Sequence, residues 1–417
     1  MKAAILTIGD EIMIGQIVDS NSAWISAFLD QHGWKITRKL AVGDDIDEIK
    51  KGIDLCRQSA DLLILTGGLG PTNDDLTVDA LTQYFHTHKA WHEETWVRIQ
   101  EIVKRFGREA TDIHKQQCYL PESAEIIANE QGTAPGMIFR DKNLILVSMP
   151  GVPSEMKHLL KDKIIHLLPK ASPVEHRFIR TAGEGETVLS EMIKDIEDGL
   201  PKEIKLAYLP SYGFVTLRLT SHATGQVTLM DSFQDRIVTR LGKLVYGIGD
   251  TNLSKAVGQL LRVRKETLGT GESCTGGYLA HLITSVPDSS DYYLGSIIPY
   301  AYEIKTSELG ISEQLLKFYG AVSEEVVSAM AKAVRDKLGV TWALSTSGIA
   351  GPGGATPTKP VGTIWIACSG PGGILKTRLL NLKRDRLGNI EYTAICESFY
   401  TILLRTWSRY AAIAFTN

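Results

Sequence analysis

Ser273 and Lys305 are the residues of this chain whose types and setting best suit nucleophilic chemistry. Ser273 lies in the stretch ESCTGG, between a segment with a strand pattern and one with a helix pattern. At such a turn, backbone amides could stabilise an oxyanion formed by attack of the serine. Serine needs an adjacent base, and the nearest histidine, His281, lies within the following helical segment. Lys305, at the end of PYAYEIK, is the better candidate base if desolvation lowers its pKa, and Tyr300 could assist proton transfer.

Two other interpretations of ESCTGG stay open from the residues alone. Ser273 or Thr275 could cap the helix that follows, without any chemistry. Cys274 could be the nucleophile instead, which would require a partly ionised thiol.

A glycine-rich acidic stretch near the N-terminus has the composition of a phosphate site. The stretch TGGLGPTNDDLT (66–77) follows a predicted strand and opens a predicted helix. Its glycines allow close approach of the backbone to a ligand, and amides at a helix N-terminus suit phosphate. Asp74 and Asp75 could bind a divalent cation, since Mg²⁺ is commonly held by one or two carboxylates plus phosphate oxygens. The simpler alternative is a tight turn whose aspartates cap the helix.

His86, His88 and His92, in HTHKAWH, raise a second metal hypothesis. The spacing lacks the acidic partner of a helical zinc site, so a polar surface loop is the ordinary interpretation.

Alternating strand and helix patterns position these motifs. In the first third of the chain we expect strands over 3–8, 34–42, 61–66 and 143–149 and helices over 21–29, 46–56 and 154–168. Strands separated by helices predict βαβ units and a parallel sheet. In the last third we expect helices over 253–263, 276–284 and 322–338 and strands starting at 266 and over 342–347 and 362–367. Ser323 should cap the helix over 322–338, and Gly339 should end it.

A small α+β unit lies between these segments. Strand patterns over 175–182, 204–208 and 214–220 and helix patterns over 187–198 and 227–241 follow in an order that resembles a KH-type module. It lacks a GXXG loop joining two helices, so RNA binding does not follow.

Length and composition limit the classes of protein to which this chain can belong. A length of 417 residues suggests about three domains. Lys plus Arg is 45 and Asp plus Glu is 48, a net charge of −3 that gives no electrostatic support for nucleic-acid binding. No apolar run approaches the roughly 20 residues of a membrane span, and MKAAILTIG is better explained as a first strand than as a signal peptide. The five cysteines are scattered and never form CxxC, so we expect a cytoplasmic protein without a disulfide framework or thiolate zinc site.

Several motifs together resemble the CinA (competence/damage-inducible) family. IGDEIMIGQI (8–17), VGDD (42–45), TGGLGPTNDDLT and MPGVPSEM (149–156) resemble the molybdopterin-binding fold at the front of such proteins. ESCTGG, the Tyr300-to-Lys305 spacing, GAVSEE and SGIAGPGGATPTKPVGT (347–363) resemble the CinA carboxy-terminal domain, which is similar to nicotinamide-nucleotide amidases. The resemblance implies an α/β fold with a molybdopterin-binding-like domain over 1–170, a small KH-like α+β domain over 171–249 and an α/β amidase domain over 250–417.

For the first domain, the resemblance implies metal-dependent ADP-ribose pyrophosphatase activity. The metal would be Mg²⁺, Mn²⁺ or Co²⁺, held at Asp44 and Asp75 with Asp10, Glu11 and Asp74 as neighbours. The phosphate site would comprise Gly67, Gly68, Gly70 and Thr72.

For the last domain, the resemblance implies hydrolysis of nicotinamide mononucleotide (NMN) to nicotinate mononucleotide and ammonia, with no cofactor. Ser273 would form an acyl-enzyme and Lys305 would relay the proton. The substrate would be held by Thr275, Gly276, Gly277, Ser347, Gly348, Gly351, Gly353 and Arg386. The chain departs from the family pattern at Pro299, Ala301, Tyr302 and Ser347, and lacks the usual Gly before Asp385-Arg386.

Two alternatives of other classes accompany this interpretation. The chain could be a non-catalytic adaptor for a recombination protein, or a molybdopterin-binding protein, the latter by analogy of fold alone. The resemblance also favours a homodimer.

Overall fold

A computed structural model describes residues 1–171, 174–211, 213–221, 223 and 225–394. The chain forms two compact units, the first made mainly of Met1–Glu175 and the second of most of the rest. Cys396 and the end of the predicted third domain lie outside the described residues. The other four cysteines are free thiols. Within the described ranges, no helix is both long and apolar enough to cross a membrane.

The first unit is built on a mixed sheet with the order β2-β1-β3-β8-β7-β6. The strands β1 (Lys2–Ile8), β2 (Lys35–Val42), β3 (Leu62–Thr66) and β8 (Leu144–Met149) are parallel, as the alternating pattern predicts. Two further strands that were not predicted, β7 (Gly136–Asp141) and β6 (Glu125–Ile127), run antiparallel and make the sheet mixed. Only Lys142 and Asn143 separate β7 from β8, and so short a loop can join only antiparallel strands.

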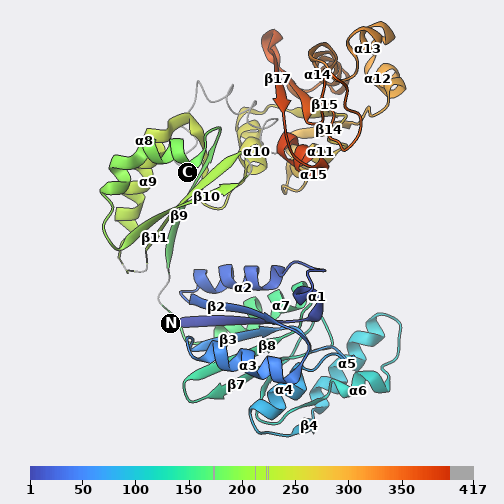
Figure 1. The fold of residues 1–417 in the computed structure, drawn as a ribbon. Helices are drawn as coiled ribbons and strands as arrows, with labels where there is room; N and C mark the ends of the chain where they lie inside the picture. The colour runs from blue at the N-terminus through green and yellow to red at the C-terminus, as the bar shows by residue number, and fades with distance from the viewer. Residues whose placement is uncertain (172–173, 212, 222, 224, 395–417) are drawn as a thin grey trace. The chain divides into compact units, whose positions relative to one another are not determined.

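Helices cover both faces of this sheet (Figure 1). Alternate residues of β1 point to opposite faces, so Ile5 packs with α2 (Ser20–Gln31) and Leu6 with α3 (Ile46–Arg57). The helix α7 (Pro153–His158) lies on the α2 side, and α4 (Thr77–Tyr84) lies on the α3 side.

The single helix predicted over 154–168 is wrong. After α7 the chain continues as a π-helical segment (Leu159–Lys163) and a 3₁₀ turn (Ile164–Leu167). The change of pitch places Leu159, Leu160 and Ile164 against the same core, where all three are fully buried.

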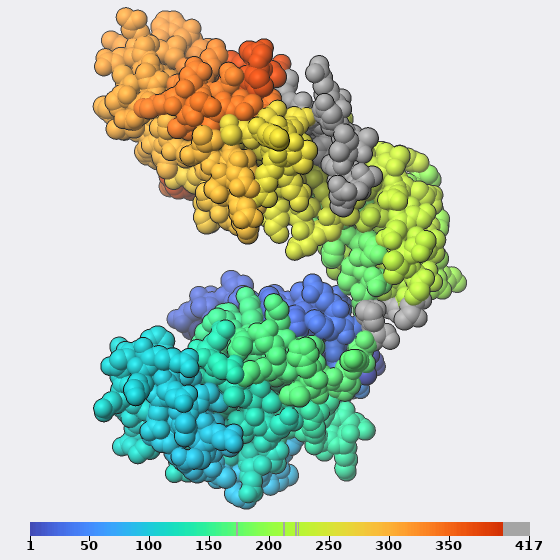
Figure 2. Space-filling model, turned by 180° about the vertical axis from the view of Figure 1, so that it is seen from behind, coloured from blue at the N-terminus to red at the C-terminus, as the bar shows by residue number. Residues whose placement is uncertain are grey.

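Residues 89–121 form a small substructure outside the main sheet, and the sequence patterns did not predict it. It contains β4 (Lys89–Trp91), α5 (Glu93–Arg105), α6 (Asp112–Gln116) and β5 (Tyr119–Pro121), and its cyan atoms form one continuous part of the unit's surface in Figure 2. His92 caps α5 by accepting from Thr95 N, and His88 pairs with Glu122 at 3.1 Å. These two contacts favour the polar surface loop over a histidine metal site, and no group of three or more His, Cys, Asp or Glu residues within the described ranges is placed to hold a metal ion by itself.

Residues 175–248 form a four-stranded antiparallel sheet covered on one face by two helices (Figure 1). The strands are β9 (Glu175–Ala182), β10 (Ile204–Ser211), β11 (Phe214–Ser221) and β12 (Val245–Ile248), and the helices are α8 (Glu186–Asp198) and α9 (Val227–Leu241). The short strand β12 was not predicted.

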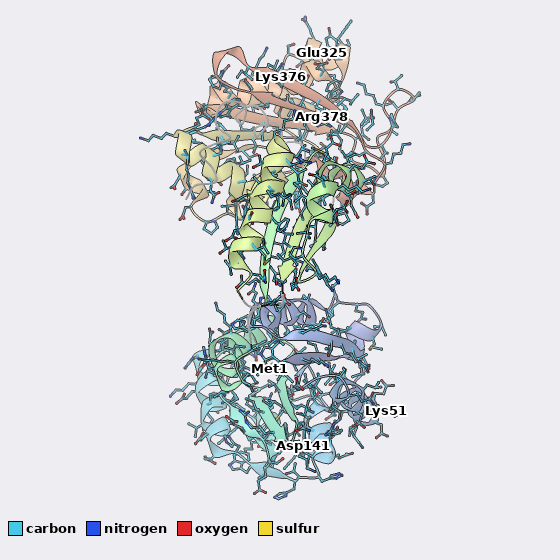
Figure 3. The ribbon with its side chains drawn as sticks, turned by 90° about the vertical axis from the view of Figure 1, so that its left-hand side faces the viewer. Met1, Lys51, Asp141, Glu325, Lys376 and Arg378 are labelled. Carbon is cyan, nitrogen blue, oxygen red and sulfur yellow. The ribbon has the colours of Figure 1, made fainter. Side chains whose placement is uncertain are left out.

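The rest of the second unit is a five-stranded sheet with the order β14-β13-β15-β16-β17. The strand β13 (Leu268–Glu272) is parallel to β14 (Tyr293–Ile297) and β15 (Trp342–Gly348), whereas β16 (Thr363–Ser369) and β17 (Leu375–Asn381) are antiparallel. The exposed charges of Lys376 and Arg378, labelled in Figure 3, protect β17 as an edge strand.

Helices pack on both faces of this sheet as well. The helices α10 (Leu253–Arg264) and α11 (Tyr278–Thr284) share one core, and α14 (Glu324–Leu338) covers the other face. Ser323 accepts a hydrogen bond from Val326 N, and Gly339 ends α14 with φ +61°, so both predicted ends are confirmed.

Candidate active sites

Ser273 follows the last residue of the parallel strand β13, at the carboxyl edge where open α/β sheets bind ligands. Its amide donates to Thr346 O at 3.0 Å, which ties it to the neighbouring strand β15. Gly276 and Gly277 then turn the chain into α11 with φ +60° and +96°. These left-handed conformations favour glycine and explain the GG of the motif.

Glu272 holds this turn in place. Its carboxylate is fully buried and accepts from the backbone N–H groups of Gly277, Leu279 and Ala280 at 3.0, 3.0 and 2.8 Å. It also accepts from the hydroxyl of Thr275 at 2.8 Å. The N-terminus of α11 is therefore satisfied by Glu272, and neither Ser273 nor Thr275 caps the helix as the simpler interpretation of ESCTGG supposed.

We expect Glu272→Gln to destabilise this unit by about 1–3 kcal/mol, the usual cost of leaving a buried hydrogen-bonding group unsatisfied. Both carboxylate oxygens accept backbone N–H bonds, so an amide NH₂ would meet a donor in either orientation. Urea unfolding measures the change. Glu325→Gln, at an exposed position on α14 labelled in Figure 3, is the control and should change the free energy of unfolding by no more than about 0.5 kcal/mol. Equal effects of the two variants would contradict this role for Glu272.

Lys305 brings a buried amine to Ser273. It lies on α12 (Tyr302–Leu309), is 1% exposed, and places Nζ 3.1 Å from Ser273 Oγ. The same Nζ lies 2.6 Å from Pro299 O and 3.0 Å from Tyr300 O. A neutral amine has two N–H groups and one lone pair. With the two carbonyls accepting the N–H groups, the lone pair is left for the serine hydroxyl.

Burial lowers the pKa of Lys305, because the charged form loses its hydration. Among the described residues, Lys305 forms no ion pair with a carboxylate that would restore the charged form. The lowered pKa shifts the equilibrium of Lys305 towards the neutral amine, the form that a general base requires.

Tyr300 contributes its backbone to this arrangement. Its carbonyl accepts from Lys305, whereas the residue as a whole is 61% exposed and lines the pocket. The proton-relay role predicted for its hydroxyl is not tested by this geometry.

A cavity of 170 Å³ connects these groups. The predicted residues Arg386, Ser347 and Gly348 also line it, and Arg386 Nη1 donates to Gly351 O at 2.6 Å. Thr275, Gly276, Gly277, Gly351 and Gly353, which were predicted to hold substrate, do not line this cavity.

The acidic site of the first unit gathers carboxylates from separate loops. Asp10 N donates to Asp44 Oδ2 at 2.9 Å, and Asp44 N donates to Asp10 Oδ1 at 3.2 Å. Burial, followed by the charges of Asp10, Glu11 and Asp74, raises the pKa of Asp44. These carboxylates supply the negative charge and the oxygen ligands that a divalent cation requires.

The glycine-rich loop is organised by Asp75. Its carboxylate accepts from Gly70 N at 2.8 Å and Thr72 N at 2.9 Å, and also from the Thr72 hydroxyl. Two of the amides suggested for phosphate are thus occupied by a side chain of the loop itself. Gly67 and Gly68 also allow close packing, because a Cβ would lie 2.1 Å from Ile8 O and 2.3 Å from Thr77 Oγ1, respectively.

A larger cavity of 480 Å³ adjoins both features. Of the predicted metal residues it is lined by Glu11, Asp44, Asp74 and Asp75, and of the phosphate residues by Gly67, Gly68 and Gly70. Mg²⁺ sites commonly use only one or two carboxylates and complete their shell with phosphate and water, so this set fits such an ion without a three-ligand cluster.

Three known protein families match three successive parts of the chain. Residues 4–170 match a probable molybdopterin binding domain, residues 176–247 the damage-inducible protein CinA KH domain, and residues 250–403 the CinA C-terminal domain. A CinA-like protein of Cytophaga hutchinsonii is 45% identical over 400 residues, covering 94% of this chain and 95% of that protein. The chain belongs to the CinA family. A CinA-like protein of Flavobacterium psychrophilum is 37% identical over 418 residues, covering 98% and 100%.

Solved structures include a CinA protein, with unknown function, of Thermoplasma acidophilum. It is 34% identical, with a TM-score of 0.37, and covers 40% of this chain and 98% of its own. The predicted CinA resemblance, the α/β class and the KH-like middle part are confirmed by the three family matches over residues 4–170, 176–247 and 250–403.

Two departures of this CinA chain from the family pattern have structural roles. Tyr302 Oη accepts from Ala321 N at 3.4 Å, and Ser347 Oγ donates to Ala321 O at 2.7 Å. Lys359, which sequence reasoning missed, donates from Nζ to Val322 O at 2.7 Å. These contacts hold the loop before α14 against the cavity. Pro299 contributes a carbonyl to Lys305, a role that any residue there could fill.

Proposed function

We propose that the carboxy-terminal domain hydrolyses the carboxamide of NMN. The observation that carries this proposal is the buried amine of Lys305 beside the hydroxyl of Ser273, with two carbonyls orienting the amine. Lys305 accepts the hydroxyl proton as Ser273 Oγ attacks the carboxamide carbon. It then gives that proton to the departing nitrogen, and ammonia leaves. Water attacks the resulting ester, Lys305 passes the water proton to Ser273 Oγ, and nicotinate mononucleotide is released.

The size of the cavity supports a mononucleotide substrate. A volume of 170 Å³ suits a pyridine ring with its carboxamide, so the ribose phosphate would extend to the rim. Arg386 is exposed at that rim, and its bond to Gly351 uses a single nitrogen of the guanidinium. The planar guanidinium is suited to binding a phosphate.

This assignment predicts a substrate-dependent effect of Arg386→Ala. We expect KM for NMN to rise by roughly 10–100-fold, the loss of a charge-assisted contact, with kcat little changed. Nicotinamide riboside, which has no phosphate, should be hydrolysed equally by the wild type and the variant. Steady-state assays of ammonia release on both substrates provide the test. An equal loss on the two substrates would contradict a phosphate role.

For the amino-terminal domain we propose hydrolysis of the pyrophosphate bond of ADP-ribose. Asp44 would hold a divalent cation together with the substrate phosphates, with Asp10, Glu11 and Asp74 adding negative charge. Such a cation would neutralise charge on the phosphates when bound. The cavity of 480 Å³ supports this substrate because it is large enough for a nucleotide sugar.

Asp44→Asn separates the two proposed activities. We expect ADP-ribose hydrolysis to fall by roughly 100-fold or more, because the variant removes the charge that holds the cation. Asn retains an oxygen that can accept from Asp10 N, so the loop should persist. NMN deamidation, measured in the same preparation, is the control and should be unchanged. Unaltered ADP-ribose hydrolysis would exclude Asp44 as a metal ligand.

The match of residues 4–170 to a probable molybdopterin binding domain favours a second candidate for this site. Tight binding of molybdopterin without binding of ADP-ribose would select it.

A further inference from the structure

Asn389 is a fully buried polar residue of the carboxy-terminal domain that the sequence did not single out. It lies on α15 (Arg386–Tyr392), about one helical turn after Arg386, the residue proposed to bind the substrate phosphate. Its Nδ2 donates to Ala350 O at 2.9 Å and to Arg384 O at 3.0 Å. One amide group therefore joins the loop that follows β15 to the turn that precedes α15.

The amide of Asn389 fits its surroundings in one orientation. Nδ2 carries two N–H groups, one for each of the two carbonyl oxygens. A flip would place Oδ1 against both carbonyl oxygens and remove both hydrogen bonds. In the observed orientation Oδ1 is buried and has no hydrogen-bond partner among the described residues, which is unfavourable. This pattern is expected of a side chain that fixes two backbone segments rather than of one that fills space.

Both segments joined by Asn389 contribute to the active-site cavity. Ala350 and Arg386 line it, and Arg386 follows Arg384 by two residues. Arg386 also depends on the loop for its orientation, because its Nη1 donates to the carbonyl of Gly351, the residue after Ala350, at 2.6 Å. Asn389 thus fixes the carbonyl that orients the guanidinium relative to the backbone that carries it.

Other hydrogen bonds hold the base of the same loop. Leu382 N donates to Gly362 O at 2.9 Å, and Gly362 N donates to Ile349 O at 2.7 Å. These bonds involve backbone atoms alone and do not depend on the side chain of Asn389. Loss of its amide should therefore release the part of the loop that contacts Arg386, while the base of the loop stays in place.

We propose that Asn389 is a positioning residue for the substrate phosphate, because it holds Arg386 in the orientation that binds the phosphate. Asn389 is fully buried and does not line the cavity, so it acts through Arg386 rather than on the substrate. A guanidinium that is already oriented loses less conformational freedom on binding, and so binds more tightly than a mobile one. The inference rests on the proposed hydrolysis of NMN and names a residue that sets its preference for a phosphorylated substrate.

Asn389→Leu tests this role, because leucine is similar in size and favours a helix but donates no hydrogen bond. We expect KM for NMN to rise by roughly 5–20-fold with kcat little changed, and KM for nicotinamide riboside, which lacks the phosphate, to stay within about twofold. Steady-state assays of ammonia release give both constants. Inhibition constants of nicotinate mononucleotide and nicotinate riboside measure the same contrast without turnover. Asn389→Ala removes the amide without adding bulk and carries the same expectation.

A double variant separates positioning from an independent effect. If Asn389 acts through Arg386, then Arg386→Ala combined with Asn389→Leu should have a KM for NMN within about twofold of that for Arg386→Ala alone. If the effects of the two substitutions multiply instead, Asn389 does not act through Arg386 and the proposal is wrong.

Asn129→Leu is the matched control. Asn129 is also fully buried, and its Nδ2 donates to Ala134 O at 2.9 Å in the first unit. Its replacement makes the same chemical change and should leave both KM values unchanged. If Asn389→Leu raises KM equally on both substrates, or on neither, the positioning role is wrong while the deamidase survives. If the wild type does not hydrolyse NMN, the proposed function fails and the positioning role fails with it.

Discussion

We expect Ser273→Ala to abolish the proposed release of ammonia from NMN and Cys274→Ala to leave its rate within about twofold, because a thiol acts as a nucleophile only when ionised. Burial raises the pKa of Cys274 to about 12, so a fraction on the order of one in ten thousand is thiolate at pH 8. The hydroxyl of Ser273, in contrast, lies 3.1 Å from the amine of Lys305, the proposed base. We expect kcat for Ser273→Ala to fall by roughly 10³-fold or more, as for other serine nucleophiles.

The two variants differ by one position in the same turn, so they control for each other's effect on folding. ADP-ribose hydrolysis in the same samples should persist in both. Loss of deamidation in Cys274→Ala, with activity retained in Ser273→Ala, would assign the nucleophile to the thiol.

Replacing Lys305 is expected to have the second-largest effect. Loss of a general base typically lowers kcat by about 10²–10⁴-fold, and we expect Lys305→Ala to fall in this range. Lys305→Arg should be equally inactive, because a guanidinium remains protonated and cannot accept the serine proton. Substantial activity of the arginine variant would show that residue 305 acts through its charge rather than as a base.

The pH dependence follows from the lowered pKa of Lys305. As the pH falls through that pKa, the amine gains a proton, its lone pair is lost, and kcat/KM falls. Above that pKa, the neutral amine persists and the rate is sustained. Because burial lowers the pKa, the acidic limb should lie below the ordinary lysine value of about 10.4. A pH–rate profile measures this limb, which should persist in Cys274→Ala.

The sequence predicted the elements whose patterns are local. The apolar stripe of α14, with Ser323 before it and Gly339 after it, predicted a helix with both its ends. The parallel strands β1, β2, β3 and β8 followed from alternating runs. The antiparallel β6 and β7 did not, because strand direction depends on loop length and pairing rather than on a strand's own pattern. The break after α7 was missed because a π turn arises from packing of adjacent leucines against one core.

In the candidate sites, too, residues in local motifs were predicted, whereas the contacts that form only in the fold were not. Ser273, Lys305 and Arg386 come from three separate motifs, and the structure places all three around one cavity. Glu272 was overlooked although it stands within ESCTGG itself. The sequence did carry a signal for this residue, because its carboxylate stands just before the glycine-rich start of a helix. Its role could not be predicted, because the backbone N–H groups that it binds come together only in the folded turn. Asp75 was predicted as a metal residue, yet its carboxylate binds amides of its own loop, a contact that residue type alone could not reveal.

The most direct test of the central claim is to incubate the purified 417-residue chain with NMN and EDTA and to quantify the products. Amide hydrolysis by Ser273 and Lys305 predicts ammonia and nicotinate mononucleotide in equal amounts, with no dependence on divalent cations. Folded protein that releases no ammonia, or that releases free nicotinamide by cleaving the glycosidic bond, would contradict the account.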